Sequence, residues 1–183
     1  MSKVSQIVLF DIDGTLITSG RAGARGMDAA FLALYGVAGA LKGVSLARRT
    51  DHAIVSDVLR AIGHQPTPEA VRVLRDAYLE HLPREMAVPH PDNRVLPGVL
   101  AALDSLAARE DVAVGLLTGN FERGAAIKLG HFDLWRRFPF GAFGDDHIDR
   151  RDLLPIAMSQ AERVGAVVPA AQVVVIGDTP LDI

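Results

Sequence analysis

Two aspartates near the amino terminus, Asp11 and Asp13, have the residue type and the spacing to do chemistry. They follow four large apolar residues (7–10, IVLF), which are typical of a strand buried on both faces of a parallel sheet. Side chains alternate along a strand, so residues two apart point to the same side, and Gly14 then permits a sharp turn. Neighbouring carboxylates are costly to bury unless a cation or a proton offsets their charge. The sequence therefore predicts a divalent metal ion beside this pair.

Polar clusters follow two later apolar segments in the same way. The sequence TGN (118–120) comes after residues 112–117, and GDTPLD (177–182) comes after residues 173–176. A weaker strand is predicted over 140–144. Ligands of α/β sheets bind outside the carboxyl ends of the strands. We therefore expect both clusters to meet the aspartate pair along one edge of the sheet.

A helical segment separates the first strand from the others. The spacing of apolar residues predicts helices over 19–37, 50–63 and 67–79, and no convincing strand within 16–90. Prolines between Pro83 and Pro97 then punctuate the chain, as expected at a domain boundary.

Beyond these prolines, the predicted strands alternate with helices over 97–106, 121–130 and 151–165, which implies right-handed crossovers. We predict a doubly wound, Rossmann-like parallel α/β core formed by residues 1–17 and 92–183. Residues 18–91 are predicted to form an inserted α-helical cap domain.

Composition excludes several kinds of site and of partner. The chain has 183 residues and no cysteine, which rules out disulfides, thiolate catalysis and cysteine-ligated zinc. A net charge of −3 gives no reason to expect nucleic acid or a membrane surface as partner. The first apolar run is too short for a signal peptide, and no stretch approaches the roughly 18–20 residues of a membrane span. We expect a cytoplasmic monomer or homodimer.

The three clusters together resemble the motifs of the haloacid dehalogenase-like (HAD) hydrolase superfamily. DIDGT is similar to the first motif, hhhhDxDGT, and TGN is similar to the second. Asp178 and Asp182 are similar to the GDxxxD pattern of the fourth motif. The helical segment resembles the α-helical cap of the branch that contains phosphoglycolate phosphatase and β-phosphoglucomutase. That resemblance implies phosphomonoester substrates and Mg²⁺ as cofactor.

The resemblance also implies a role for each acid. Asp11 would be the nucleophile that forms an aspartyl-phosphate. Asp13 would protonate the leaving alcohol and then accept a proton from the attacking water. Mg²⁺ would bind the carboxylates of Asp11 and Asp178 and the main-chain carbonyl of Asp13, with Asp182 orienting the metal shell or the cation.

The second motif implies a phosphate-binding site. Thr118 would hydrogen-bond a phosphoryl oxygen through its hydroxyl. The amides of Gly119 and Asn120 would lie nearby at a helix N-terminus, which is a favourable place for an anion.

The third motif is expected to supply a cation, usually a lysine followed by proline, and no Lys-Pro occurs here. Arg150 and Arg151 stand at the start of the helix before the last strand, where the cation is usual. Lys128 lies about six residues into the helix after TGN, on the order of 9 Å along its axis. Helical side chains lean toward the N-terminus, so an extended lysine could cover much of that gap. We rank Lys128 slightly before Arg150.

The cap is expected to set specificity. Arg49, at the start of a predicted cap helix, is a candidate for binding a second anionic group of the substrate, because guanidinium pairs with carboxylate or phosphate in bidentate fashion. A solvated basic turn is the alternative.

We predict a Mg²⁺-dependent phosphatase for a small phosphorylated metabolite such as phosphoglycolate. Asp13 favours phosphate esters, since dehalogenases of the family lack an acid there. A phosphosugar mutase of the β-phosphoglucomutase type and a receiver-like phospho-switch stay open. The family's sheet gains another strand and helix after the fourth motif, so we expect the chain ending at Ile183 to be a fragment of a longer protein.

Overall fold

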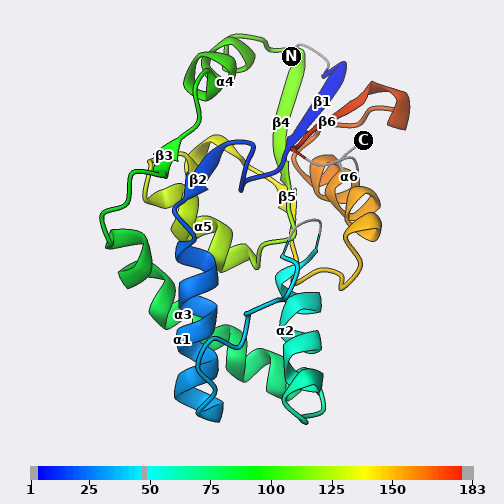
Figure 1. Ribbon diagram of the computed structural model, residues 1–183. Helices are drawn as coiled ribbons and strands as arrows, with labels where there is room; N and C mark the ends of the chain where they lie inside the picture. The colour runs from blue at the N-terminus through cyan, green and yellow to red at the C-terminus, as the bar shows by residue number, and fades with distance from the viewer. Residues whose placement is uncertain (1–3, 47–48, 179–183) are drawn as a thin grey trace.

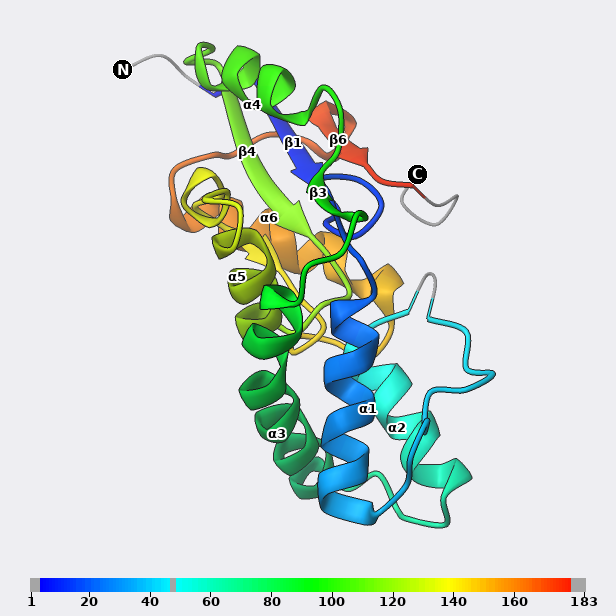
Figure 2. The ribbon, with the colours of Figure 1, turned by 60° about the vertical axis from the view of Figure 1, so that its left-hand side comes forward.

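A parallel sheet with helices on both faces and a separate group of three helices form the molecule (Figures 1 and 2). The computed structural model describes residues 4–46 and 49–178. Within these residues, none of the helices combines the length and the apolar character that crossing a membrane requires. The parallel α/β class predicted from the sequence is confirmed.

The sheet has the strand order β5-β4-β1-β6, and every neighbouring pair is parallel. Its strands are β1 (Gln6–Phe10), β4 (Val112–Leu117), β5 (Gly141–Ala142) and β6 (Val173–Ile176). The strand predicted over 140–144 is therefore shorter than expected. β1 is central, and Val8 pairs with Val114 on one side and Val174 on the other.

The apolar run of β1 supplies both cores beside the sheet. Val8 and Phe10 pack into one cluster with α5 (Glu122–Gly130), whereas Ile7 and Leu9 pack into another with α6 (Leu153–Arg163). Strand alternation sends successive residues to opposite faces, which explains why four consecutive residues are all apolar.

Three helices and three short 3₁₀ turns accompany the sheet. The helices are α4 (Val99–Ala107), α5 (Glu122–Gly130) and α6 (Leu153–Arg163). The turns are η1 (Trp135–Arg137), η2 (Arg150–Asp152) and η3 (Ala170–Gln172).

The separate helical group consists of α1 (Ala22–Tyr35), α2 (Asp51–Ala61) and α3 (Pro68–Ala87), which share a core of their own (Figure 2). The start of α2 is determined by Thr50, whose hydroxyl accepts a hydrogen bond from the Ala53 amide at 3.1 Å. Thr67 caps α3 in the same way, with Pro68 at the first helical position.

Two expectations about the helical segment are wrong. A short strand, β2 (Ile17–Ser19), lies within 16–90 and pairs antiparallel with β3 (Asn93–Val95). Three residues are too few for a recognisable period, and the pairing joins segments that are remote in sequence. Pro83 is also no boundary but lies inside α3, where the buried Leu82 and Met86 keep the helix against the core.

Candidate active site

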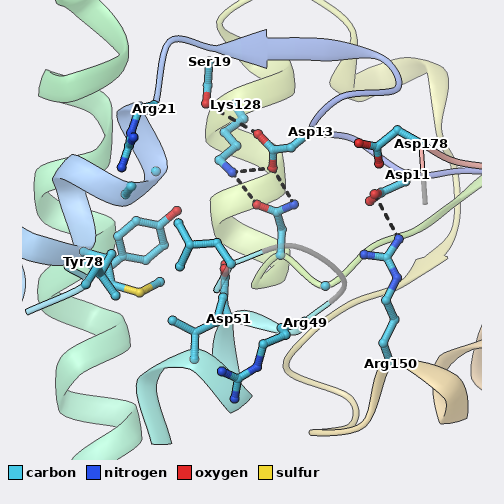
Figure 3. Close-up of a pocket in the computed structure, with 18 residues that line it drawn as sticks. Asp11, Asp13, Ser19, Arg21, Arg49, Asp51, Tyr78, Lys128, Arg150 and Asp178 are labelled. Atoms are coloured by element: carbon cyan, nitrogen blue, oxygen red, sulfur yellow. Dashed lines mark hydrogen bonds and ion pairs between the residues drawn. The ribbon is translucent and has the colours of Figure 1, made fainter. Parts of the chain in front are cut away.

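A cavity of about 280 Å³ lies where the carboxyl ends of the strands face the helical group. Figure 3 shows that charged side chains from both parts of the molecule point into it. The acids in its wall are Asp11, Asp13, Asp51 and Asp178. The cations in its wall are Arg21, Arg49, Lys128 and Arg150.

Asp11 directly follows β1 and faces Arg150. Arg150 Nη2 lies 2.9 Å from Asp11 Oδ2, and both side chains are less than a tenth exposed. Burial raises the pKa of the Asp11 carboxyl, and the charge and hydrogen bond of Arg150 offset this only in part. Arg150 belongs to the turn η2 before α6, where the sequence placed two of its three candidate cations.

Asp13 faces a different cation. Lys128 Nζ from α5 lies 2.6 Å from Asp13 Oδ2 and 2.6 Å from Asn120 Oδ1, and Asn120 Nδ2 donates to the same Asp13 oxygen at 2.9 Å (Figure 3). The lysine side chain is 6% exposed, whereas that of Asp13 is 41% exposed toward the cavity. Burial tends to raise the pKa of Asp13, but the charge and hydrogen bond of Lys128 outweigh it and lower the pKa. The side chain of Lys128 thus extends back along α5 far enough to contact Asp13 and Asn120.

The second motif forms a tight loop between β4 and α5. Thr118 is fully buried, and its hydroxyl accepts hydrogen bonds from the main-chain and side-chain nitrogens of Asn120 at 3.3 and 2.9 Å. Thr118 is not among the described residues that line the cavity, whereas Gly119 and Asn120 are. A Cβ on Gly119 would lie 2.3 Å from the Arg49 carbonyl oxygen. Glycine is therefore what lets the segment before α2 approach this loop.

The predicted metal ligands can be compared with the geometry in part. Asp178 follows β6, which pairs directly with β1, and it lines the same cavity as Asp11. A Cβ on Gly14 would lie 2.4 Å from Asp178 Oδ2, so only glycine leaves room for this carboxylate beside the DIDGT loop. Asp182 lies outside the described residues.

This set of oxygen donors fits Mg²⁺, which prefers carboxylate and carbonyl oxygens. Among the residues that the structure describes, no three acid or histidine side chains are close enough to form a metal site by themselves. The carboxylate of Asp13 is turned to Lys128. The expected site made of the Asp11 and Asp178 carboxylates and the Asp13 main-chain carbonyl stays a prediction.

The remaining two candidate arginines have partners outside the acid pair. Arg49 lines the cavity, but its guanidinium is hydrogen-bonded to Asp57 and to the Ala53 carbonyl oxygen. Arg151 is exposed and pairs with Asp149 on the surface. Of the three cations considered for the third motif, the structure brings Lys128 and Arg150 to the acids and leaves Arg151 outside.

Sequence reasoning missed three residues of the cavity wall. Asp51 was seen only as part of a helix start, yet its Oδ2 accepts a hydrogen bond from the Phe121 amide at 3.0 Å and its own amide donates to the Gly119 carbonyl oxygen at 2.7 Å. Burial raises the pKa of Asp51 to about 6. Tyr78 was read as an apolar helix position, and burial raises the pKa of its phenol.

Arg21 is the third missed residue. It adopts a left-handed backbone conformation (φ 64°) at the start of α1 and lines the cavity. The motifs gave no signal for it, because it lies within 19–37, a stretch that the apolar spacing identified only as a cap helix.

Comparison with known proteins bears on the family and the fold of the chain. The family model of haloacid dehalogenase-like hydrolases matches residues 8–183. A search of curated protein sequences gave no match.

Several solved structures share the fold. CbbY from Rhodobacter sphaeroides, in complex with phosphate, has 22% sequence identity and a TM-score of 0.69 over 93% of this chain and 76% of that one. A hydrolase from Pseudomonas syringae has 22% identity and a TM-score of 0.66 over 97% and 78%. A predicted phosphoglycolate phosphatase from Haemophilus somnus has 16% identity and a TM-score of 0.61 over 94% and 76%.

Proposed function

The chain belongs to the haloacid dehalogenase-like hydrolases, and from that premise we propose that it is a Mg²⁺-dependent phosphatase that hydrolyses a small phosphomonoester through an aspartyl-phosphate intermediate. The observation that carries this proposal is the acid pair of the DIDGT loop, in which each carboxylate has its own buried cation. The bound phosphate of CbbY is consistent with such a site, although its 22% identity with this chain speaks for the fold alone.

Asp11 is the proposed nucleophile. A carboxylate that attacks a phosphate dianion meets charge repulsion, so positioning and electrostatic stabilisation dominate phosphoryl transfer. Arg150 contacts Asp11 at 2.9 Å and is itself almost completely buried. It can therefore hold the carboxylate in place and contact the transferred phosphoryl group without competition from water.

Asp13 is the proposed acid and base. Lys128 lowers its pKa in the free enzyme, so the carboxyl is ionised before substrate binds. An incoming phosphate dianion adds negative charge beside Lys128 and Asp13, and like charge raises the pKa of a carboxyl. Asp13 would then take up the proton that it gives to the leaving alcohol and later recover it from the attacking water.

The metal would be held by the carboxylates of Asp11 and Asp178 and by the carbonyl of Asp13. When bound, Mg²⁺ neutralises charge on the phosphoryl oxygens and orients the phosphate for attack. The residue Asp182 is predicted to orient this shell.

The second motif, at the part of the cavity wall formed by Gly119 and Asn120, would also bind the phosphoryl oxygens. Gly119 and Asn120 line the cavity just before α5, where main-chain amides attract anions. Thr118 supports this loop through its hydrogen bonds with Asn120.

The family match argues against the receiver-like phospho-switch. Substrate and reaction are best tested by assaying the purified protein against a panel of phosphorylated metabolites with Mg²⁺ and then with excess chelator. We expect phosphate release that the chelator abolishes and that added Mg²⁺ restores. Absence of release from every ester, including p-nitrophenyl phosphate, would refute the proposal. Isomer formation from a hexose phosphate without free phosphate would identify a mutase instead.

A further inference from the structure

Among the described residues, the cations of the cavity wall are paired with carboxylates, with one informative exception. Arg150 pairs with Asp11, Lys128 pairs with Asp13, and the guanidinium of Arg49 is engaged by Asp57. Arg21 differs from these cations, because its exposed guanidinium makes no hydrogen bond or ion pair with any residue of the described part of the chain. A cation that lines a ligand cavity without a protein partner is available to a ligand.

Arg21 lies away from the reacting end of the cavity. In Figure 3, it stands on the far side of the Lys128–Asp13 pair from Asp11 and Asp178. A phosphoryl group held at Asp11 would therefore leave Arg21 to another part of the same substrate. The cavity wall also includes apolar side chains, Met27 and Ile54 among them, which suit a short carbon chain.

The backbone around Arg21 strengthens this assignment. Arginine at φ 64° occupies a conformation that favours glycine, and such strain persists where the side chain is needed. Arg21 also directly precedes α1, whose first turn contributes Gly23 and Ala24 to the cavity wall.

We propose that Arg21 is the specificity residue of the site and binds a second anionic group, a carboxylate or a phosphate, at the far end of the substrate. This inference rests on the proposed phosphatase function and names its substrate class: short phosphomonoesters that carry two anionic groups. It assigns to Arg21 the role that the sequence suggested for Arg49, whose guanidinium already has protein partners.

A matched series of three-carbon esters tests the proposal. Propyl phosphate has no second anionic group, 3-phosphooxypropanoate carries a carboxylate, and 1,3-propanediol bisphosphate carries a second phosphate. We expect the protein to prefer one of the two doubly anionic esters, and which one is preferred distinguishes the carboxylate from the phosphate. Guanidinium pairing with an anion predicts that Arg21→Gly lowers kcat/KM for that ester by about 10- to 100-fold, mainly through KM.

The same substitution is expected to change kcat/KM for propyl phosphate by less than about twofold, because this ester has no second anionic group for Arg21 to bind. Glycine suits the backbone at this position, so the melting temperature should not fall. Arg21→Lys keeps the charge and should recover part of the preference. Arg136, exposed and outside the cavity, provides the control, and Arg136→Ala should behave as the unchanged protein.

Equal loss on all three esters in Arg21→Gly, or no loss on any, would overturn the proposal while leaving the phosphatase function intact. A larger selective loss in Arg49→Ala than in Arg21→Gly would return the role to Arg49. Absence of phosphate release by the unchanged protein from all three esters and from p-nitrophenyl phosphate would overturn the phosphatase function and this inference with it.

Discussion

The two aspartates of the DIDGT loop stand two residues apart, yet they lie in opposite electrostatic surroundings. On the Asp11 side, the carboxylate is buried, and Arg150 only partly offsets the rise of its pKa. On the Asp13 side, the carboxylate is partly exposed, and Lys128 lowers its pKa. The same residue type thus acquires different proton affinities, because burial outweighs the cation at Asp11, whereas Lys128 and the neighbouring hydrogen bonds outweigh burial at Asp13.

This difference indicates which of the two carboxyl groups can exchange protons during the reaction. Asp13 is open to the cavity and shares its oxygen with a lysine and an amide, so a change of charge in the cavity can alter its protonation. Asp11 is closed in by Arg150 and the sheet, which suits a nucleophile with a fixed direction of attack. The proposed division into nucleophile and acid–base follows from these surroundings.

The largest expected effect comes from the Asp11 side. Asp11→Asn removes the proposed nucleophile and should lower kcat/KM for p-nitrophenyl phosphate by about 10³-fold or more. The amide keeps the shape of the side chain, so the circular dichroism spectrum should change little, whereas loss of the charge beside the buried Arg150 should lower the melting temperature. Retention of a tenth of the activity would contradict the assignment.

Arg150 and Arg151 sharpen the contrast, because they are adjacent and differ mainly in burial. Arg150→Ala leaves the buried carboxylate of Asp11 without this cation and should cost about 10²- to 10³-fold in kcat/KM. It should also cost about 2–4 kcal/mol of unfolding free energy.

Arg151→Ala is the matched control, because its pair with Asp149 is on the surface. It should change the unfolding free energy by less than about 0.5 kcal/mol and leave kcat/KM unchanged. Urea unfolding and initial rates measure both quantities. Equal effects of the two substitutions would mean that Arg150 has no special role.

The Asp13 side should respond through pH. In Lys128→Gln, Asp13 loses the charge that lowers its pKa, so the limb of the pH–rate profile that reports Asp13 should move to higher pH. The rate at neutral pH should fall by about 10- to 100-fold.

The exposed residue Lys42 offers the control substitution, Lys42→Gln, which should leave the profile unchanged. Profiles of kcat/KM between acidic and alkaline pH make the comparison. An unshifted limb in Lys128→Gln would show that this lysine does not set the proton affinity of Asp13.

The smallest expected effect concerns Asp51, which links α2 to the loop before α5. Its pKa of about 6 is above the value of 3.8 for the unfolded chain, so the folded state binds the proton more tightly. Stability due to this group is therefore present below about pH 4 and is lost as the pH rises through about 6.

Asp51→Asn should remove this pH-dependent slope of the unfolding free energy. Between pH 4 and pH 7, the variant should therefore lose about 1–2 kcal/mol less stability than the unchanged protein. Urea unfolding at several pH values measures it. Glu162→Gln, at an exposed position, should leave the slope as it is. If the unfolding free energy of Asp51→Asn keeps the same dependence on pH, this dependence arises from other titratable groups.

Much of the core could be predicted from local pattern. The residues of β1 are apolar in succession because both faces of the strand are buried, and this burial is what made the strand recognisable. The pair β2–β3 was missed because its three-residue strands form only when remote segments meet. Pro83 was misjudged because tertiary packing of α3 outweighs the loss of one helical hydrogen bond.

The residues of the candidate site also divide into those that the sequence predicts and those that only the structure reveals. The acids, the TGN loop and Asp178 could be found from the sequence, since each directly follows a strand and parallel strands end at one edge. The sequence by itself also determined the family, through the order and spacing of these clusters. Only the tertiary structure decided which cation faces which acid, that Arg49 is engaged by Asp57, and that Arg21 lines the same cavity. The physical reason is that a long charged side chain can reach several partners, and packing of distant helices selects among them.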